Sequence, residues 1–212
     1  GASNESSSAT GVNGDQTNND VFQSGAAYVF VREGGTWTQQ AYLKASNTGE
    51  GDHFGAAVAI DGETIAVGAI MERSNAAGIN GDQENNSLSG AGAVYVFVRN
   101  GDTWSQEAYI KPNNPDLGDF FGGALSIDDN TLVVGVPGED GGGSGVNADQ
   151  SVNNWTSAGA AYVFVRDGGT WSQQAYLKAS NTGVNDNFGW NVGVSSETVV
   201  VGALFEDSNA TG

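Results

Sequence analysis

Tyr28-Val29-Phe30-Val31-Arg32 is a run of five residues that the chain repeats without change. The second copy lies at residues 95–99 and the third at residues 162–166, so each step is 67 residues long. A constant step is the signature of a repeat protein, in which each unit packs mainly on its neighbours. The sequence therefore predicts three equivalent units.

Other landmarks keep the same step, with no insertion or deletion between units. They are a tryptophan, a Phe-Gly pair and a Val-Gly pair: Trp37, Trp104 and Trp171; Phe54-Gly55, Phe121-Gly122 and Phe188-Gly189; Val67-Gly68, Val134-Gly135 and Val201-Gly202. Residues 202–212 repeat the pattern of residues 1–11, so both ends of the sequence fall in the same loop of the unit. The sequence starts at Gly1, with neither a signal peptide nor an initiator Met, so we expect a processed product or a fragment.

Each unit has the residue pattern of four β-strands, because no stretch shows the apolar period of a helix. The expected strands are residues 54–60, 64–69, 26–32 and 36–44, with equivalents one or two steps further along the chain. The second and third of these are apolar on both faces, which is typical of central strands in a sheet. The Asp61-Gly62 pair favours a tight hairpin turn between the first two strands.

The fourth strand alternates apolar and polar residues, as expected of an outer strand with one face in water. In this interpretation Trp37, Ala41 and Leu43 belong to the packed face. Gln40 and Lys44 belong to the solvated face.

Four antiparallel strands per unit, a fixed step and small residues on the first strand together predict an all-β fold, a β-propeller of four-stranded antiparallel blades. Three repeats' worth of blades lie in residues 1–212, as one propeller or a segment of one. Complete blades are expected at residues 52–115 and 119–182. An outer strand pair at residues 25–46 and an inner strand pair at residues 186–204 are complementary halves of a split blade.

Composition excludes several classes of function. The 212 residues include 25 acidic and 7 basic residues, and a formal net charge of −18 repels phosphate backbones, so no nucleic-acid partner is expected. No apolar run approaches the ~20 residues that cross a bilayer, so no membrane insertion is expected. The lack of Cys excludes thiolate zinc sites, and the single His53 excludes mechanisms that need two imidazoles.

The order of these motifs resembles the FG-GAP repeat of the integrin α-subunit propeller and its bacterial relatives. The resemblance rests on the Phe-Gly start of each unit, on endings such as Val67-Gly68-Ala69 and Gly135-Val136-Pro137, and on the Tyr-Val-Phe strand that follows. It implies an extracellular or cell-surface propeller that acts in adhesion or recognition of a protein or glycan. Integrin-type units also carry a calcium loop after the Phe-Gly strand, but the hairpin at residues 60–64 is too short to hold it.

A separate candidate calcium site lies in the long loop between the second and third strands, residues 72–89 in the central copy. Carboxylate and amide oxygens suit Ca²⁺, which takes six to eight oxygen ligands. The alternative is that these side chains cap turns by bonding to nearby backbone. The candidate ligands are Asp15, Glu72, Asn80, Asp82, Glu139, Asn147 and Asp149.

Three aspartates recur once per unit, two residues before each Phe-Gly pair: Asp52, Asp119 and Asp186. An active site is built once on a scaffold, whereas a structural need arises in every unit, so turn capping is favoured over catalysis. His53 lies beside the first aspartate, but its equivalents are Phe120 and Asn187, so we expect a surface residue without a special role.

The tryptophans fall into two groups. Trp37, Trp104 and Trp171 have identical places in the unit, which favours packing between blades, where burying each ring contributes about 1.5–3 kcal/mol. Trp190 has the small equivalents Ala56 and Gly123, so it is a candidate ligand contact near the start of the inner strand.

Three blades are too few to close a propeller, which typically has four to eight. Either further repeats of a longer chain complete the ring, or copies of this chain associate head to tail through the split blade. The sequence thus favours a non-enzymatic recognition propeller, with Ca²⁺ as its candidate cofactor. The alternative function is a structural assembly unit that closes or polymerises through the split blade. An enzyme is the weakest class.

Overall fold

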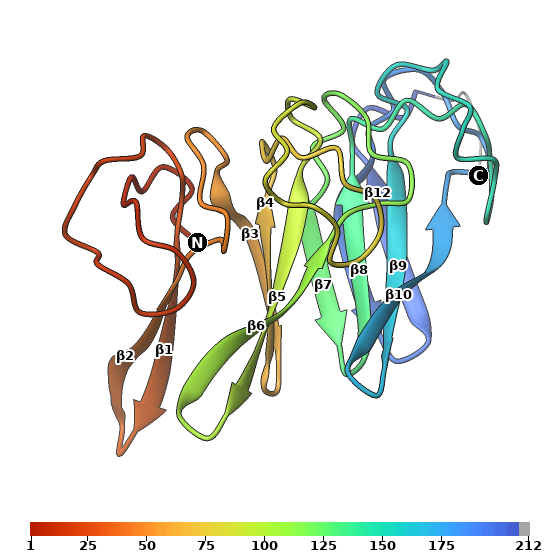
Figure 1. The fold of residues 1–212 in the computed structure, drawn as a ribbon. Helices are drawn as coiled ribbons and strands as arrows, with labels where there is room; N and C mark the ends of the chain where they lie inside the picture. Colours follow the sequence, from red (N-terminus) through yellow and green to blue (C-terminus); the bar gives the residue numbers. More distant parts are fainter. Residues whose placement is uncertain (208–212) are drawn as a thin grey trace.

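The computed structural model describes residues 1–207, which form a row of antiparallel β-sheets connected by loops (Figure 1). The strands are β1 (Ala27–Glu33), β2 (Thr36–Leu43), β3 (Phe54–Asp61), β4 (Thr64–Ala69), β5 (Ala93–Asn100), β6 (Thr103–Ile110), β7 (Ala124–Asp128), β8 (Thr131–Val136), β9 (Ala160–Asp167), β10 (Thr170–Leu177), β11 (Phe188–Ser195) and β12 (Thr198–Ala203). Over residues 1–207 we find no helix long and apolar enough to cross a membrane.

The strands form two complete sheets and two half-sheets. The orders β3-β4-β5-β6 and β7-β8-β9-β10 follow the chain, and every neighbouring pair is antiparallel. The two-stranded sheets are β1-β2 and β11-β12. The all-β fold with antiparallel four-stranded sheets is therefore confirmed. The complete sheets lie within residues 52–115 and 119–182, and the strand pairs lie within residues 25–46 and 186–204.

Apolar side chains fill the spaces between neighbouring sheets, and each sheet packs on the next along the chain. The first layer joins β1-β2 to the β3–β6 sheet, the second joins the two complete sheets, and the third joins the β7–β10 sheet to β11-β12. Representative members are Val29, Leu43, Phe54 and Tyr95 for the first, Val96, Ile110, Phe121 and Tyr162 for the second, and Val133, Val163, Val192 and Val199 for the third.

The recurring glycines mark where the backbones of neighbouring sheets touch. A Cβ atom built on Gly68 of β4 would lie 2.1 Å from the carbonyl oxygen of Gly122, which belongs to the next unit's Phe-Gly pair. One step further, a Cβ on Gly135 would lie 2.0 Å from the carbonyl oxygen of Gly189. Gly122 also has a φ of 93°, which side chains disfavour. The Val-Gly and Phe-Gly motifs are therefore two halves of one contact between sheets.

The outer strands correct two sequence predictions, the common packed face of Trp37, Ala41 and Leu43 and the solvated position of Lys44. The pairing of β1 with β2 shifts between Val29 and Phe30 of β1, which leaves Gln40 of β2 without a partner residue. The same bulge recurs in β6 and β10. A bulge reverses the alternation of faces beyond it. Trp104 therefore packs on the preceding sheet while Ala108 packs on the following one. The prediction of a solvated Lys44 is also wrong, because this side chain is fully buried.

The three equivalent tryptophans differ in burial. Trp104 and Trp171 are 4% and 3% exposed, so they lie between sheets as expected. Trp37 is 66% exposed, because within the described residues no sheet precedes β1-β2.

The glycine contact predicts a matched pair of variants. Gly68→Ala should lower the free energy of unfolding by about 3 kcal/mol, because the facing atom is backbone and a rigid core tolerates extra volume poorly. Gly202→Ala is the control, since its Cβ would meet nothing closer than 3.9 Å. It should change stability by less than about 0.5 kcal/mol. Urea unfolding measures both, and equal losses would contradict the proposed role of Gly68.

Candidate functional site

The long loops lie at one end of the sheets and the tight hairpin turns lie at the other (Figure 1). The loop end holds the connections from β4 to β5 and from β8 to β9, together with the links between successive sheets. Six of the seven candidate metal ligands lie in these two connections, and Asp15 lies in the equivalent segment before β1. This end, called the loop end below, is the candidate functional region.

A buried ion pair fixes the start of each long loop. Glu72 follows β4, Lys111 follows β6, and Lys111 Nζ lies 3.0 Å from Glu72 Oε2, with both side chains fully buried. The equivalent pairs are Glu139 with Lys178 at 3.1 Å and Glu5 with Lys44 at 2.9 Å. Each pair therefore ties a loop to the end of the outer strand.

Hydrogen bonds complete the anchor around Glu72. Its Oε1 accepts bonds from the backbone N–H of Ser74 at 3.1 Å and from Asn47 Nδ2 at 3.3 Å. Burial lowers the pKa of Lys111, and the adjacent carboxylate opposes that shift by stabilising the charged ammonium. A buried charge needs such partners, because desolvation without them costs several kcal/mol.

The remaining candidate ligands bond to backbone. Asn80 has a φ of 55°, and its Oδ1 accepts a bond from the N–H of Tyr109 at 2.9 Å, an arrangement that Asn147 repeats with Tyr176 at 3.0 Å. Each aspartate caps a turn by accepting a hydrogen bond from the backbone N–H two residues further along the chain. Asp15, Asp82 and Asp149 accept bonds from the N–H groups of Thr17, Glu84 and Ser151 at 2.8, 3.0 and 2.9 Å.

These contacts do not fit a calcium site made of the seven candidate ligands. Glu72 and Glu139 already bind a lysine ammonium, and the two asparagine oxygens face backbone N–H groups. Within residues 1–207, no three acidic or histidine side chains come together as a metal would require. Calcium binding thus stays a prediction, and the turn-capping alternative accounts for Asp15, Asp82 and Asp149.

The recurring aspartates are buried beside the ion pairs. Asp52, Asp119 and Asp186 are nearly inaccessible to solvent, and Asp119 Oδ2 accepts a bond from the N–H of Asp116 at 3.0 Å, which is a turn-capping contact. Burial raises the pKa of Asp52 to about 6, helped by the negative charge of Glu72. Burial likewise raises the pKa of Asp119 to about 7. Their burial leaves no room for a substrate at these carboxyl groups.

Trp190 lies at the loop end on the bulge that opens β11. The indole is 45% exposed, and its edge-to-face partner is Phe205, with ring centroids 6.4 Å apart. His53, Phe120 and Asn187 share one place in the unit and have φ values of 56°, 59° and 53°. That position is therefore set by backbone conformation, and the imidazole of His53 carries no special role in it.

Sequence reasoning missed other exposed apolar residues of the loops. They are Phe22, Leu117, Phe120 and Val184. Each could have been found by comparing units, because Phe22 replaces Ser89 and Thr156, and Leu117 replaces Glu50. Differences among equivalent positions mark residues that the shared fold does not require.

Comparison with known protein families places the chain among repeat proteins. The family model of the FG-GAP repeat matches residues 37–97, 104–164 and 171–212. The starts of the three matches are the equivalent tryptophans, one repeat step apart. No curated protein matches the chain.

The buried ion pairs predict unequal costs for removing equivalent lysines. Lys111→Met should destabilise the protein by about 3–5 kcal/mol, because it leaves the carboxylate of Glu72 buried and uncompensated. Lys44→Met should cost less stability, because the side chain of Glu5 is 13% exposed and water can still solvate its carboxylate. Adding Glu72→Gln to Lys111→Met should recover part of the loss in urea unfolding. No recovery would mean that charge is not the cause.

The buried aspartates predict a pH dependence. The pKa values of Asp52 and Asp119 in the folded state are about 6 and about 7, above the ordinary 3.8. The folded state therefore binds more protons than the unfolded state between pH 3.8 and these raised values. Stability should therefore fall as pH rises through 6 to 7. Melting temperatures at pH 5 and pH 8 measure this change. An Asp52→Asn, Asp119→Asn variant should show a smaller drop than the unaltered chain, and an equal drop would contradict the assignment.

Proposed function

The chain belongs to the FG-GAP repeat family, with three repeats, and from this premise we propose that it is an extracellular or cell-surface propeller that recognises a protein or glycan through its loop end. In this proposal the sheets are blades and the protein is not an enzyme. The observation that carries it is the exposed Trp190–Phe205 pair, in which Trp190 lies on the bulge that opens β11 at the loop end.

Rigid loops with exposed aromatic groups suit recognition. Binding sites gather on loops held by a rigid scaffold, and aromatic side chains supply much of the binding energy at interfaces. An indole also offers a flat apolar face to a sugar ring or an apolar side chain, with an N–H group at its edge. Trp190 is the only one of its three equivalents with a large side chain, so packing within the repeat does not explain it.

The titratable groups support a binding role over catalysis. The Asp52, Glu72 and Lys111 set recurs as Asp119, Glu139 and Lys178, and both sets are buried. A catalytic set must reach its substrate, whereas in these sets the glutamate pairs with the lysine and the aspartate is buried beside them. The net charge of −18 favours neutral or basic partners and disfavours nucleic acid.

The loop-end site predicts loss of binding in one tryptophan variant. The chain is screened against immobilised polysaccharides and extracellular-matrix proteins, and Trp190→Ala should weaken the strongest interaction on the order of 10-fold or more. Asp102→Ala is the control, because its side chain is also exposed but lies in the β5-β6 turn at the hairpin end, outside the half-sheets. Equal effects, or no binding to any probe, would count against the loop-end proposal.

The same assay tests whether calcium takes part. Binding is measured with millimolar Ca²⁺ and again with a chelator. A requirement for Ca²⁺ would support a role of the acidic loops, and the melting temperature would then rise with Ca²⁺, since a ligand of the folded state stabilises it.

A second candidate function is assembly, with the split blade as its means. The observation that favours it is the pair of half-sheets, β1-β2 and β11-β12. Within residues 1–207, β1 and β12 each pair with one strand, whereas their equivalents β5, β4 and β8 each pair with two. Exposed strand edges are templates for pairing with another chain.

A further inference from the structure

The face of β1-β2 that points away from the row is apolar and exposed. Phe30 is 53% exposed, whereas its equivalents Phe97 and Phe164 are fully buried. Trp37 and Tyr28 lie on the same half-sheet and are exposed as well. Within the described residues, no sheet covers this face in the way that β1-β2 covers the equivalent face of β5-β6.

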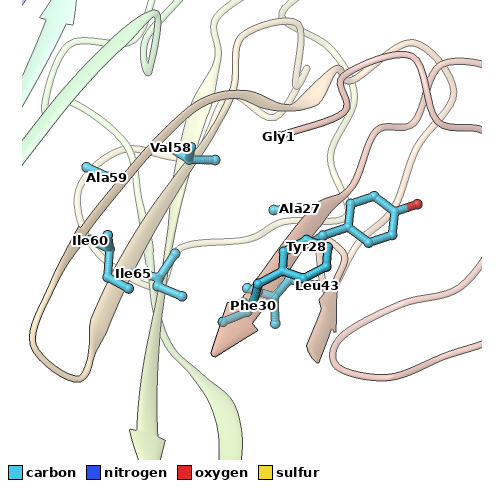
Figure 2. A pocket seen from close by; sticks show the side chains of 10 residues that line it. Gly1, Ala27, Tyr28, Phe30, Leu43, Val58, Ala59, Ile60 and Ile65 are labelled. Atoms are coloured by element: carbon cyan, nitrogen blue, oxygen red, sulfur yellow. The ribbon is translucent and has the colours of Figure 1, made fainter. Parts of the chain in front are cut away.

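A first groove lies beside the inner edge of β1, with which no strand of residues 1–207 pairs. It has a volume of about 270 Å³ and is lined by β1 on one side and by Val58, Ile60 and Ile65 on the other (Figure 2). Ile60 is largely exposed, whereas its equivalent Ile127 is buried under the inner strands of the preceding sheet. The groove therefore has the place and the lining of a missing inner hairpin.

A second groove lies where β12 has no outer neighbour. It has a volume of about 510 Å³ and is lined by Val163, Gln174, Leu177 and Val199, among others. Val200, on the other face of β12, is 68% exposed, although its equivalents Ala66 and Val133 are fully buried. This second groove has the place of a missing outer hairpin.

We propose that each groove receives the complementary half-sheet of a second copy of this chain. The β11-β12 hairpin of one copy would fill the first groove, and β1-β2 of the other copy would fill the second, so that β11, β12, β1 and β2 form one four-stranded sheet. This inference deepens the assembly function and is independent of ligand binding at the loop end.

The packing within the chain is a template for the second groove. Trp104 Nε1 donates to Gln40 Oε1 of the preceding sheet at 2.8 Å, and Trp171 Nε1 donates to Glu107 Oε2 at 2.8 Å. The next acceptor in this series is Gln174, which lines the second groove. The matching donor is the exposed Trp37 of the second copy.

Charge complementarity supports the same pairing. In the β3–β6 sheet, Arg99 of β5 binds Glu63 of the β3-β4 turn, with Nη2 2.7 Å from Oε1. The equivalent residues at the junction are Arg32 on β1 and Glu197 on the β11-β12 turn. Within residues 1–207 neither of these two forms an ion pair, so each is available to the other across the junction.

The template also fixes the register of the shared sheet. In both complete sheets the second and third strands pair with one common offset. Carried to the junction, it pairs Thr198 with Val31, Val199 with Phe30, Val200 with Val29, and Val201 with Tyr28. Beyond Val201 the place beside Ala26 is already held by Ala2, so Gly202 and Ala203 must compete with the first residues of the other copy.

Two such junctions would join two copies into a ring of six blades, within the usual range for propellers and without a free edge. A ring of two copies contains two equivalent junctions, so a substitution at the junction weakens both of them. Sedimentation should therefore show twice the chain mass of 21.7 kDa, or higher multiples where junctions continue into an open series.

Reversal of the paired charges tests the contact. Arg32→Glu and Glu197→Arg should each raise the dissociation constant on the order of 10-fold, and the double variant should return it to within about 3-fold of the unaltered chain. The control is Leu117→Asp, an equally exposed change at the loop end, which should leave association unchanged. A chain that stays monomeric throughout, or single variants without effect, would overturn the proposal.

Cysteine cross-linking tests the register, because the chain has no Cys of its own. Mixing Val200→Cys with Val29→Cys under oxidising conditions should give a disulfide-linked dimer. Val200→Cys mixed with Phe30→Cys should not, since neighbouring residues of a strand point to opposite faces. The reverse result would overturn the register. A monomer that still binds a ligand through Trp190 would overturn this inference alone and leave loop-end recognition intact.

Discussion

The contact on which the rest of the structure depends is the meeting of two glycines between neighbouring sheets. Gly68 faces Gly122, and Gly135 faces Gly189, so close that a single methyl group would collide with a backbone oxygen. Because these contacts fix the spacing of the sheets, the larger side chains of β4, β5 and β6 can interlock in the space that is left. An insertion within β4 or β8 would move its glycine out of line, and β4, β8 and β12 are each six residues long.

The loop end depends on a second recurring arrangement, the glutamate–lysine pair. Each pair joins the residue that opens a long loop to the residue that follows the outer strand, and aspartates with raised pKa values lie alongside. These groups hold the loops in place and are themselves inaccessible. Recognition in the proposed function therefore falls to residues that differ among units, above all Trp190.

Much of the fold could be predicted from the sequence because the repeat shows each strand three times. The bulge at Gln40 could not, since an extra residue in one strand is visible only against its partner strand. The burial of Lys44, Lys111 and Lys178 was also missed, although each lysine follows a glutamate at the same interval of 39 residues. That constant interval was the available signal. The sequence also makes Glu72 and Glu139 candidate calcium ligands, because it does not reveal that each carboxylate faces a lysine ammonium.

The glutamate–lysine pairs have a consequence for how such proteins diversify. Each pair clamps a loop at its base, so exposed residues further along the loop, such as Glu84, Asn86 and Ser87 in the central copy, contribute little to the stability of the sheet. Substitutions there can accumulate, or be introduced by design, without loss of the fold. The chain thus offers a frame onto which new binding sequences could be grafted at several adjacent positions.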